Sequence, residues 1–474
     1  MNRFARWVLA AGAVAVILAA SPRTVFDLDR FLVPKELALH ATAFVAGVCT
    51  LRRMRWTRTD WLLLAFLGLS ALSALLATNK WLGFRALAVS ASGVVLFWAA
   101  RALADAGHQR AVLNALAVAV VLAAAVALLQ AYGVETAFFA ETRSPGGTLG
   151  NRNFVAHIAA FGLPLCLLAA LHARRLFLGA AGVAIVGAAL VLTRSRAGWL
   201  AAAIALLLFA VFAFREHARR LVALLVVMAA GVGAALLIPN ALQWRSRNPY
   251  LESMTNVVDY ESGSGRGRLV QYAQSLRMAA RYPLLGVGPG NWAVEYPRHA
   301  ARHDPSLDDS GMTFNPWPSS DWVAFVAERG LAVALLFGLA LLSLLRRDAA
   351  LLAVMAGAVV AGLFDAVLLL PAPALLAWTA FGAMSAGETP AVQPARTPAL
   401  LVLVIVAAGL VRSGAQLAAM EIFATRGDRA SLERASRIDP GSFRIHMRLR
   451  SRCAHLEAAH ALYPAAEEAR GGCR

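Results

Sequence analysis

The chain has 474 residues, of which 59% are hydrophobic and 15% are charged, and its mean hydropathy is +0.62. Soluble domains are only about 45–50% apolar, so this composition excludes an ordinary soluble protein and indicates a polytopic membrane protein. The formal net charge is +18, but the arginines form short clusters between apolar runs. That spacing is typical of topology signals and of contacts with membrane lipids, so we expect no nucleic-acid partner.

Apolar stretches long enough to cross a bilayer, about 17–25 residues each, predict an all-α fold with 12–13 transmembrane helices. The first stretch could also be a signal peptide, because Arg3 and Arg6 precede an apolar core that ends at Ser21. The predicted spans lie near residues 7–20, 31–51, 61–77, 84–103, 111–131, 154–171, 176–192, 197–214, 221–238, 322–345, 349–370, 372–385 and 399–418.

Basic residues in the short loops predict the orientation of these spans. With the N-terminus inside, one set of connections collects the arginine clusters, such as Arg52, Arg53, Arg55 and Arg58, and the other set holds only scattered basic residues. The positive-inside rule therefore selects one topology. It places the loops at 132–153, 193–196 and 239–321 on the external face, together with the tail after residue 418.

A polar segment, Gly147 to Asn153, opens the sixth predicted span at its external end. Glycines permit tight turns, and the free backbone N–H groups at the start of a helix favour a nearby anion. Asn151 and Asn153 are therefore candidate substrate contacts. A plain connecting loop is the alternative interpretation of the same residues.

Two arginines, Arg194 and Arg196, lie in a short turn between two predicted spans. An arginine at the membrane boundary is costly unless it reaches water or is paired, so two in one turn predict a binding function. Contact with lipid headgroups is the alternative. The positive-inside rule disfavours that alternative, because it would put such a pair on the opposite face.

The large external loop at 239–321 interrupts the apolar pattern and decides the functional interpretation. Gly265-Arg266-Gly267-Arg268 is followed by Leu269, Leu276 and Ala279 at helical spacing, and Tyr282-Pro283 ends the run. This pattern predicts an amphipathic helix of about fifteen residues on the membrane surface. A guanidinium at its start, that of Arg268, can form bidentate bonds to phosphate, and Arg266 is a second candidate contact.

The last region, residues 419–474, changes composition and forms a predicted helical tail, separate from a transmembrane domain at 1–418. Leu432, Ala435 and Ile438 follow helical spacing and resemble part of a tetratricopeptide helix pair. Fewer than three repeats do not form a stable solenoid, so we interpret the tail as a small helical appendage. An interaction role and a plain surface helix both stay open.

Four cysteines and ten histidines provide no recognisable metal-ligand spacing, so no metal site is predicted. Cys49 and Cys166 fall in apolar spans and are interpreted as small core residues. For Cys453 and Cys473 in the tail, a disulfide and two free thiols are both open.

Taken together, these motifs resemble the O-antigen ligase and O-antigen polymerase superfamily, which contains bacterial membrane glycan ligases, polymerases and protein O-glycosyltransferases. The resemblance covers roughly residues 30–385. The residues that carry it are Gly147 to Asn153, Ser195 to Gly198, Arg268 with Tyr282 to Gly288, Asp321 to Gly330, and Phe364-Asp365 with Pro371 and Pro373.

The resemblance implies a GT-C-like glycosyltransferase that needs no metal or other cofactor and uses an undecaprenyl-diphosphate-linked glycan. It also implies a bacterial inner (cytoplasmic) membrane location with a periplasmic active face. The family arginines that hold the diphosphate correspond to Arg196 and Arg268. Arg194, Arg266, Asn151, Asn153 and Asp321 are further candidate substrate contacts.

The sequence departs from the family pattern at one position. The family commonly has a histidine just before the aspartate-aromatic pair that begins the span after the large loop, and Ser319 occupies that position here. A base that accepts the acceptor's proton must then come from elsewhere. Within the loop we prefer His303 with Asp304, because an imidazole titrates near working pH. Solvated loop charges are the alternative interpretation of these two residues.

Several functions stay open. An O-antigen ligase of lipopolysaccharide biosynthesis, a polysaccharide polymerase and a protein O-glycosyltransferase differ in their acceptor, which is a glycolipid, a glycan or a protein. From a different class, a secondary transporter or lipid flippase would have a similar number of spans. Transporters place ionisable residues near the midplane, often in inverted repeats. Here Asp365 is the only well-buried candidate acid, and no inverted repeat is visible.

Overall fold

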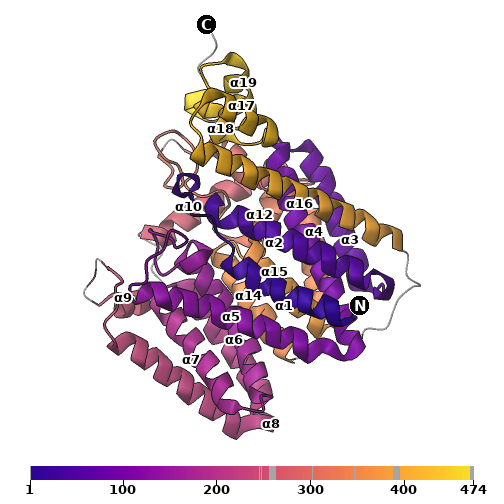
Figure 1. The fold of residues 1–474 in the computed structure, drawn as a ribbon, viewed down its shortest axis with the longest axis vertical. Coiled ribbons are helices and arrows are strands. Elements are labelled where there is room, and N and C mark those ends of the chain that lie inside the picture. The colour runs from indigo at the N-terminus through magenta and orange to yellow at the C-terminus, as the bar shows by residue number, and fades with distance from the viewer. Residues whose placement is uncertain are drawn as a thin grey trace.

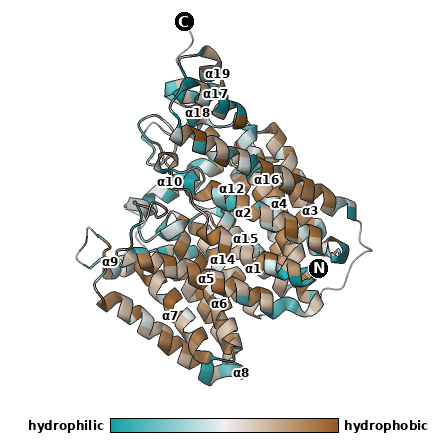
Figure 2. Ribbon diagram, viewed as in Figure 1, coloured by the Kyte–Doolittle hydropathy of each residue, from teal (hydrophilic) through white to brown (hydrophobic). Residues whose placement is uncertain are grey.

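The computed structural model describes residues 2–244, 246, 248–255, 263–301, 303–345, 349–387 and 396–469. Within these ranges the regular secondary structure is helical and contains no strand, which confirms the predicted all-α class. Hydrophobic residues dominate the bundle, whereas hydrophilic residues gather in the tail, around α10 and at the bend of α8 (Figure 2). Cys473 and most of the proline-containing segment at 388–398 lie outside the described residues.

The first half of the chain forms a set of long apolar helices (Figure 1). They are α1 (Asn2–Leu18), α2 (Asp29–Thr50), α3 (Arg58–Leu76), α4 (Lys80–Leu103), α5 (Gln109–Ala131), α6 (Arg152–Leu171), α7 (Leu176–Leu192) and α8 (Arg196–Leu237). Two predicted pairs of spans meet without a long loop. The chain turns at Gly107, which has a φ of 82°, and α8 bends at His217.

The second half begins with the large loop, which carries α9 (Pro249–Thr255), α10 (Gly263–Arg281) and α11 (Trp292–Glu295). The bundle continues with α12 (Asp321–Arg329), α13 (Leu331–Leu344), α14 (Ala349–Phe364), α15 (Pro371–Met384) and α16 (Arg396–Thr425). Gly330 divides the predicted span at 322–345, because its φ of 86° breaks the helix and a Cβ there would collide with the carbonyl oxygen of Leu284.

By length and composition, six helices in the described part of the chain can cross a membrane, and three shorter apolar helices accompany them. Polytopic membrane character is therefore confirmed. The number of helices that meet the length criterion is smaller than the predicted 12–13 spans, because bends join some spans and Gly330 interrupts another. The six are Asp29–Arg53, Arg58–Leu76, Lys80–Ala131, Arg152–Leu171, Arg196–Leu237 and Arg396–Thr425.

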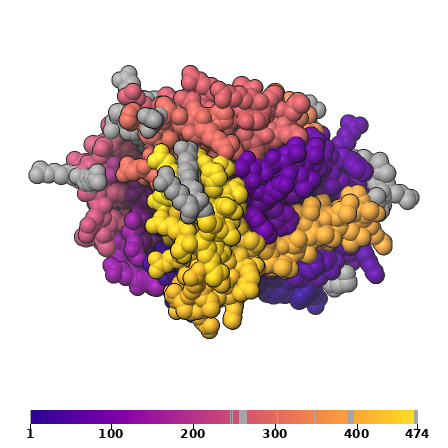
Figure 3. Space-filling model, turned by 90° about the horizontal axis from the view of Figure 1, so that it is seen from above, coloured from indigo at the N-terminus to yellow at the C-terminus, as the bar shows by residue number. Residues whose placement is uncertain are grey.

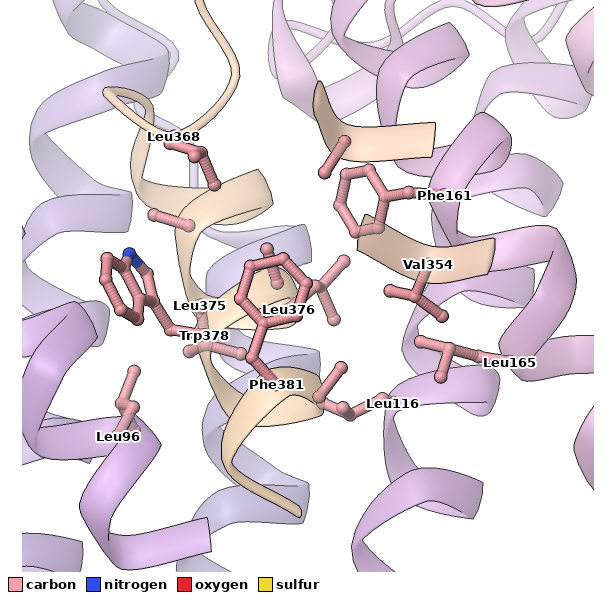
Figure 4. Close-up of a cluster of buried hydrophobic side chains, with 14 of the residues drawn as sticks. Leu96, Leu116, Phe161, Leu165, Val354, Leu368, Leu375, Leu376, Trp378 and Phe381 are labelled. Atoms are coloured by element: carbon pink, nitrogen blue, oxygen red, sulfur yellow. The ribbon is translucent and has the colours of Figure 1, made fainter. Parts of the chain in front are cut away.

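The centre of the bundle is α15, in which all 14 residues are buried. At about 1.5 Å per residue, it is too short to cross a hydrocarbon layer of about 30 Å. Trp378 and Phe381 of α15 lie among Leu96 of α4, Phe161 of α6 and Val354 of α14 (Figure 4). The predicted span at 372–385 is thus an interior helix, surrounded by protein.

A helix, α10, is present where the amphipathic helix is predicted after Gly265. Gln271, Ser275 and Met278 are buried, whereas Leu269 and Leu276 are about half exposed, at 49% and 50%. Leu269 and Leu276 therefore lie on the outer face of α10, where they suit a membrane surface, whereas Ala279 is buried.

The tail helices are α17 (Arg429–Ile438), α18 (Phe443–Arg448) and α19 (Cys453–Leu462). They lie against both the N-terminal half of the chain and the large loop (Figure 3). Arg444 Nη2 is 2.6 Å from Asp27 Oδ2, and the amide nitrogen of Asn79 donates to the carbonyl of Leu462 at 3.3 Å. On the loop side, Met312 packs against a small apolar cluster of the tail. These contacts hold the tail at a fixed place on the bundle.

Candidate functional site

A cavity of about 750 Å³ opens where α6, α8, α10 and the segment 305–319 meet. We call it the arginine cavity, because guanidinium groups dominate its charge. Two carboxylates also line it, those of Glu252 and Asp365. The five arginines that line it are Arg143, Arg152, Arg194, Arg196 and Arg268. Such a site favours an anionic ligand, and guanidinium groups match the geometry of phosphate oxygens.

The start of α6 forms the first wall. Gly150 has a φ of 85°, and a Cβ there would press into the ring of Phe31, so only glycine allows the turn that precedes the helix. Asn151 is the N-cap residue, and its side-chain oxygen accepts from the backbone N–H of Asn153 at 3.0 Å. Asn153 in turn directs its amide nitrogen to Asp365 Oδ2 at 3.4 Å. Both predicted asparagines therefore line the cavity, and Asn151 also shapes the helix start.

The turn before α8 forms the second wall. Ser195 caps the helix by accepting from the N–H of Gly198, which leaves Arg196 as the first helical residue, with its side chain lining the cavity. Two helices, α6 and α8, thus begin at this cavity. The exposed N–H groups and the dipole of a helix N-terminus both favour negative charge.

Arg194 is bound to neighbouring residues of the large loop. It has a φ of 56°, which non-glycine residues rarely adopt. Its Nε donates to Ser253 Oγ at 2.7 Å, and Nη2 is 3.4 Å from Glu252 Oε2. The guanidinium groups of Arg194 and Arg152 lie 5.1 and 4.9 Å from the ring of Trp244. Arg194 therefore holds α9 of the large loop beside the cavity.

The large loop forms the third wall through α10. Arg268 lines the cavity, and no ion pair joins it to a described residue. The buried Gln271, one turn further along α10, connects this helix to the segment 305–319 by two hydrogen bonds. Its Nε2 donates to Ser306 Oγ at 3.2 Å, and its Oε1 accepts from the N–H of Ser319 at 2.6 Å. The serine at the family's histidine position thus lies in the cavity wall.

A histidine and a carboxylate that sequence reasoning did not pair meet at the cavity wall. His157 Nε2 of α6 is 3.8 Å from Asp365 Oδ2, and the two side chains are 1% and 14% exposed. His157 Nδ1 has no hydrogen-bond partner among the described residues. One sequence signal could have found this pair: His157 lies four residues after Asn153, and therefore on the same helical face.

Four predicted site residues do not line the cavity. Arg266 and His303 are exposed. Asp304 is buried, and its two oxygens accept from the hydroxyl of Tyr296 at 2.9 Å and the N–H of Ser306 at 2.8 Å. The structure therefore does not bring the predicted base, His303 with Asp304, to the cavity: Asp304 serves the internal structure of the loop, and neither residue lines the cavity.

The fourth of these residues, Asp321, is fully buried. Its carboxylate oxygens accept from the backbone N–H groups of Val367 and Leu368, both at 2.9 Å. These bonds fix the connection that follows Asp365 between α14 and α15. Asp321, a predicted substrate contact, therefore does not line the cavity, and its hydrogen bonds go to the backbone of this connection.

The pKa of Tyr296 supports the structural role of Asp304 within the loop. Burial raises the pKa of the Tyr296 hydroxyl, and its hydrogen bond to Asp304 raises it further. Tyr296 is therefore a neutral donor that satisfies Asp304. Among the described residues, no group of three or more His, Cys, Asp or Glu side chains has the arrangement of a metal site.

Comparison with protein-family models gives a match over residues 181–338 to the family described as O-antigen ligase. The matched range contains Arg194, Arg196 and Arg268 of the cavity wall, together with the large loop. It does not reach α6 or Asp365, so the histidine–carboxylate pair lies outside it. No curated protein matches the chain significantly.

Proposed function

Because residues 181–338 match the family described as O-antigen ligase, we propose that the protein transfers a glycan from undecaprenyl diphosphate to an acceptor hydroxyl. The family match and the apolar helices support glycan transfer of the O-antigen ligase type at a membrane. The carrier, the acceptor, the inner bacterial membrane and the external position of the site belong to the proposal.

One observation carries the proposal. Arginines from three stretches far apart in the chain line one cavity, and two helix N-termini open onto it. A diphosphate has the charge and the geometry for such a site. The cavity is also near the upper part of the usual range for small-molecule sites, about 300–1,000 Å³. A passive loop would give no reason to gather these charges.

In the proposed reaction, the oxygen of the acceptor hydroxyl attacks the anomeric carbon of the carrier-linked sugar. The bond between that carbon and the phosphate oxygen breaks, and its electron pair leaves with the carrier diphosphate. A single displacement inverts the anomeric centre. Arg196 and Arg268 stabilise the charge that develops on the leaving diphosphate, which is the kind of preorganised electrostatic interaction that usually contributes most to catalysis.

The acceptor proton needs a base, and we assign it to Asp365. Its carboxylate lines the cavity and is the more exposed member of the pair with His157. His157 lies behind it, at a distance that allows one modest rearrangement to form a hydrogen bond. Asn153 holds the same carboxylate oxygen. This pair takes the role that the family histidine would have at Ser319.

The experiment is a transfer assay with the purified protein in vesicles that contain an undecaprenyl-diphosphate-linked glycan. We expect equal amounts of free undecaprenyl diphosphate and glycosylated acceptor, unchanged by a chelator. A strict requirement for a divalent cation, or carrier movement without sugar release, would contradict the mechanism, and the second outcome would indicate a flippase. Glycolipid, glycan and protein acceptors, supplied in parallel, distinguish a ligase, a polymerase and a protein glycosyltransferase.

The position of the site is tested separately. A Ser310→Cys variant places a thiol in the large loop, and an impermeant thiol reagent should label it in intact spheroplasts. Labelling only after the membrane is permeabilised would place the loop in the cytoplasm and remove the proposed orientation. The unsubstituted protein gives the background from its own cysteines.

A further inference from the structure

A second cavity, of about 470 Å³, adjoins the arginine cavity. Three residues, Leu28, Phe314 and Trp317, line both cavities and form the boundary between them. The remaining walls come from the two ends of the chain, α4, the large loop, α12 and the connection between α14 and α15. We call this second site the acidic cavity, because carboxylates outnumber guanidinium groups in its lining, by five to three.

The tail forms the outer wall of the acidic cavity. Seven of the lining residues come from it: Met420, Asp439, Gly441, Ser442, Phe443, Arg444 and Tyr463. Arg444 is bonded to Asp27 of the N-terminal loop, and Gly441 lies directly over Trp81, where a Cβ would contact the indole at 2.7 Å. The two ends of the chain therefore close this cavity together. The tail is part of a site and more than an appendage.

Much of the charge in this cavity is already satisfied. Arg85 Nε donates to both oxygens of Glu36 at 2.9 Å, and its Nη2 donates to Asp29 at 2.8 Å. Glu328 accepts from the backbone N–H groups of Gly290 and Trp292. These bonds leave a rigid polar floor that carries no excess positive charge. A second phosphate group is therefore disfavoured here, in contrast to the arginine cavity.

Three lining groups retain hydrogen-bonding capacity. Arg412 donates to Gln416 at 2.8 Å, but its buried Nε has no partner among the described residues. Burial raises the pKa of the Asp439 carboxyl, and its oxygens can accept hydrogen bonds. Burial also raises the pKa of Tyr463 to about 12, which keeps its hydroxyl neutral. A ligand with many hydroxyl groups would match these donors and acceptors.

Aromatic rings provide the apolar part of the lining. Phe443 and Tyr463 meet edge to face, with ring centroids 5.1 Å apart. Phe314 is 65% exposed, although it lies in the wall shared by the two cavities. Aromatic faces beside a few fixed polar groups are the usual composition of a small-molecule site. The C–H faces of a sugar ring pack on such rings, and its hydroxyl groups reach the polar side chains.

We propose that the acidic cavity binds a saccharide next to the reacting centre, and that the C-terminal tail is a wall of this saccharide site. The inference rests on the proposed glycan transfer and deepens it by assigning the sugar to a place. The saccharide has two possible sources, the glycan on the carrier and the glycan of the acceptor. Their shared chemistry is a hydroxyl-rich ring without phosphate.

The first test is protection of single cysteines from a maleimide in the full-length protein. Ser442→Cys reports on the acidic cavity, Ser306→Cys reports on the arginine cavity, and Ser451→Cys on the exposed side of the tail is the control. The probes are inorganic pyrophosphate and two oligosaccharides. One oligosaccharide is released by mild acid from the cell's own lipid-linked glycan, and the other is the saccharide part of its surface glycolipid.

We expect one oligosaccharide to slow the labelling of Ser442→Cys at least about fivefold, with no change at positions 306 and 451. The oligosaccharide that protects identifies the source. At about 10 mM, even a site with a Kd near 1 mM is mostly filled. Absence of protection by both oligosaccharides at that concentration, or equal protection by pyrophosphate, would overturn the saccharide site.

The same experiment separates this inference from the proposed function. Pyrophosphate should protect Ser306→Cys and leave Ser442→Cys reactive. If pyrophosphate fails at position 306 while an oligosaccharide protects position 442, the diphosphate site is wrong and the saccharide site stands. If pyrophosphate protects position 306 and neither oligosaccharide protects position 442, the saccharide site is wrong and the diphosphate site stands.

Kinetics provide the second test and do not depend on a cysteine. Phe443→Ala and Asp439→Asn should each raise KM for one of the two substrates about tenfold and change kcat less than about twofold. Arg434→Ala and Glu457→Gln, on exposed positions of the same tail, are the matched controls. An unchanged KM for both substrates in folded Asp439→Asn and Phe443→Ala protein would contradict the proposal.

Discussion

The arginine cavity and the acidic cavity share a wall but carry opposite charge. In the first, five guanidinium groups face two carboxylates, and in the second, three guanidinium groups face five carboxylates. The shared residues Leu28, Phe314 and Trp317 bear no charge. A substrate with a charged end and a neutral, hydroxylated end would therefore lie across the boundary in one direction only.

The two cavities also differ in how their charges are held. Arg85 of the acidic cavity is fixed by two carboxylates, so it maintains structure. Arg268 of the arginine cavity has no such partner among the described residues. A charge that is paired inside the protein stabilises the fold, whereas an unpaired one is costly unless a ligand satisfies it. This difference separates ligand-binding arginines from structural ones better than position in the sequence does.

The largest effect is expected from the arginine cavity. Arg196→Ala and Arg268→Ala should each lower the transfer rate about a hundred- to thousandfold, or about 2.7–4 kcal/mol, by analogy with the loss of one oxyanion donor. The rate of product formation in reconstituted vesicles measures it. Arg277→Ala, on the exposed side of α10, is the matched control and should keep normal transfer. Normal rates in both cavity variants would remove the diphosphate site.

The next effect concerns the proposed proton acceptor in the wall of the arginine cavity, Asp365. Asp365→Asn keeps the size of the side chain but removes the base, and we expect a loss of about a hundredfold, the lower end for general-base catalysis. Asp309→Asn, at an exposed position in the loop, is the control. An unchanged kcat in Asp365→Asn would show that the base lies elsewhere or that none is used.

Arg194 provides a smaller effect, through position. Its bonds to Ser253 and Glu252 hold α9 beside the cavity, so Arg194→Ala should lower kcat/KM about tenfold. If Arg194 acts by holding α9, Glu252→Ala should add little to the loss in the double variant, because residues of one network are not additive. Full additivity in the double-mutant cycle would instead indicate that Arg194 contacts the substrate directly.

Much of the arginine cavity could be predicted from the sequence. The predicted topology placed Arg194, Arg196 and Arg268 on the external face. The positive-inside rule disfavours arginines on that face, so their presence there indicated a function. The structure brings all three to one cavity. The helix start at Asn151 was recognisable for a different reason: glycine followed by asparagine often precedes a helix.

Other parts depend on tertiary structure and could not be predicted. His303 and Asp304 are adjacent in sequence, but the loop uses Asp304 to bind Tyr296, so adjacency indicated a base that does not reach the cavity. His157 and Asp365 come from helices that only the folded bundle brings together. The helical spacing of the tail indicated helices, but it contained no information on which surface they would cover.

The smallest effect distinguishes the two cavities by salt. Exposed charges are screened with a Debye length of about 10 Å at 0.1 M and about 3 Å at 1 M. Pyrophosphate protection of Ser306→Cys should therefore weaken severalfold between these concentrations, because the attraction comes from several partly exposed guanidinium groups. Oligosaccharide protection of Ser442→Cys should change little, because hydrogen bonds and ring contacts with a neutral sugar are weakly screened. Equal salt dependence of protection at both positions would mean that charge does not decide which part of the substrate binds in which cavity. The opposite charges of the two linings would then need another explanation.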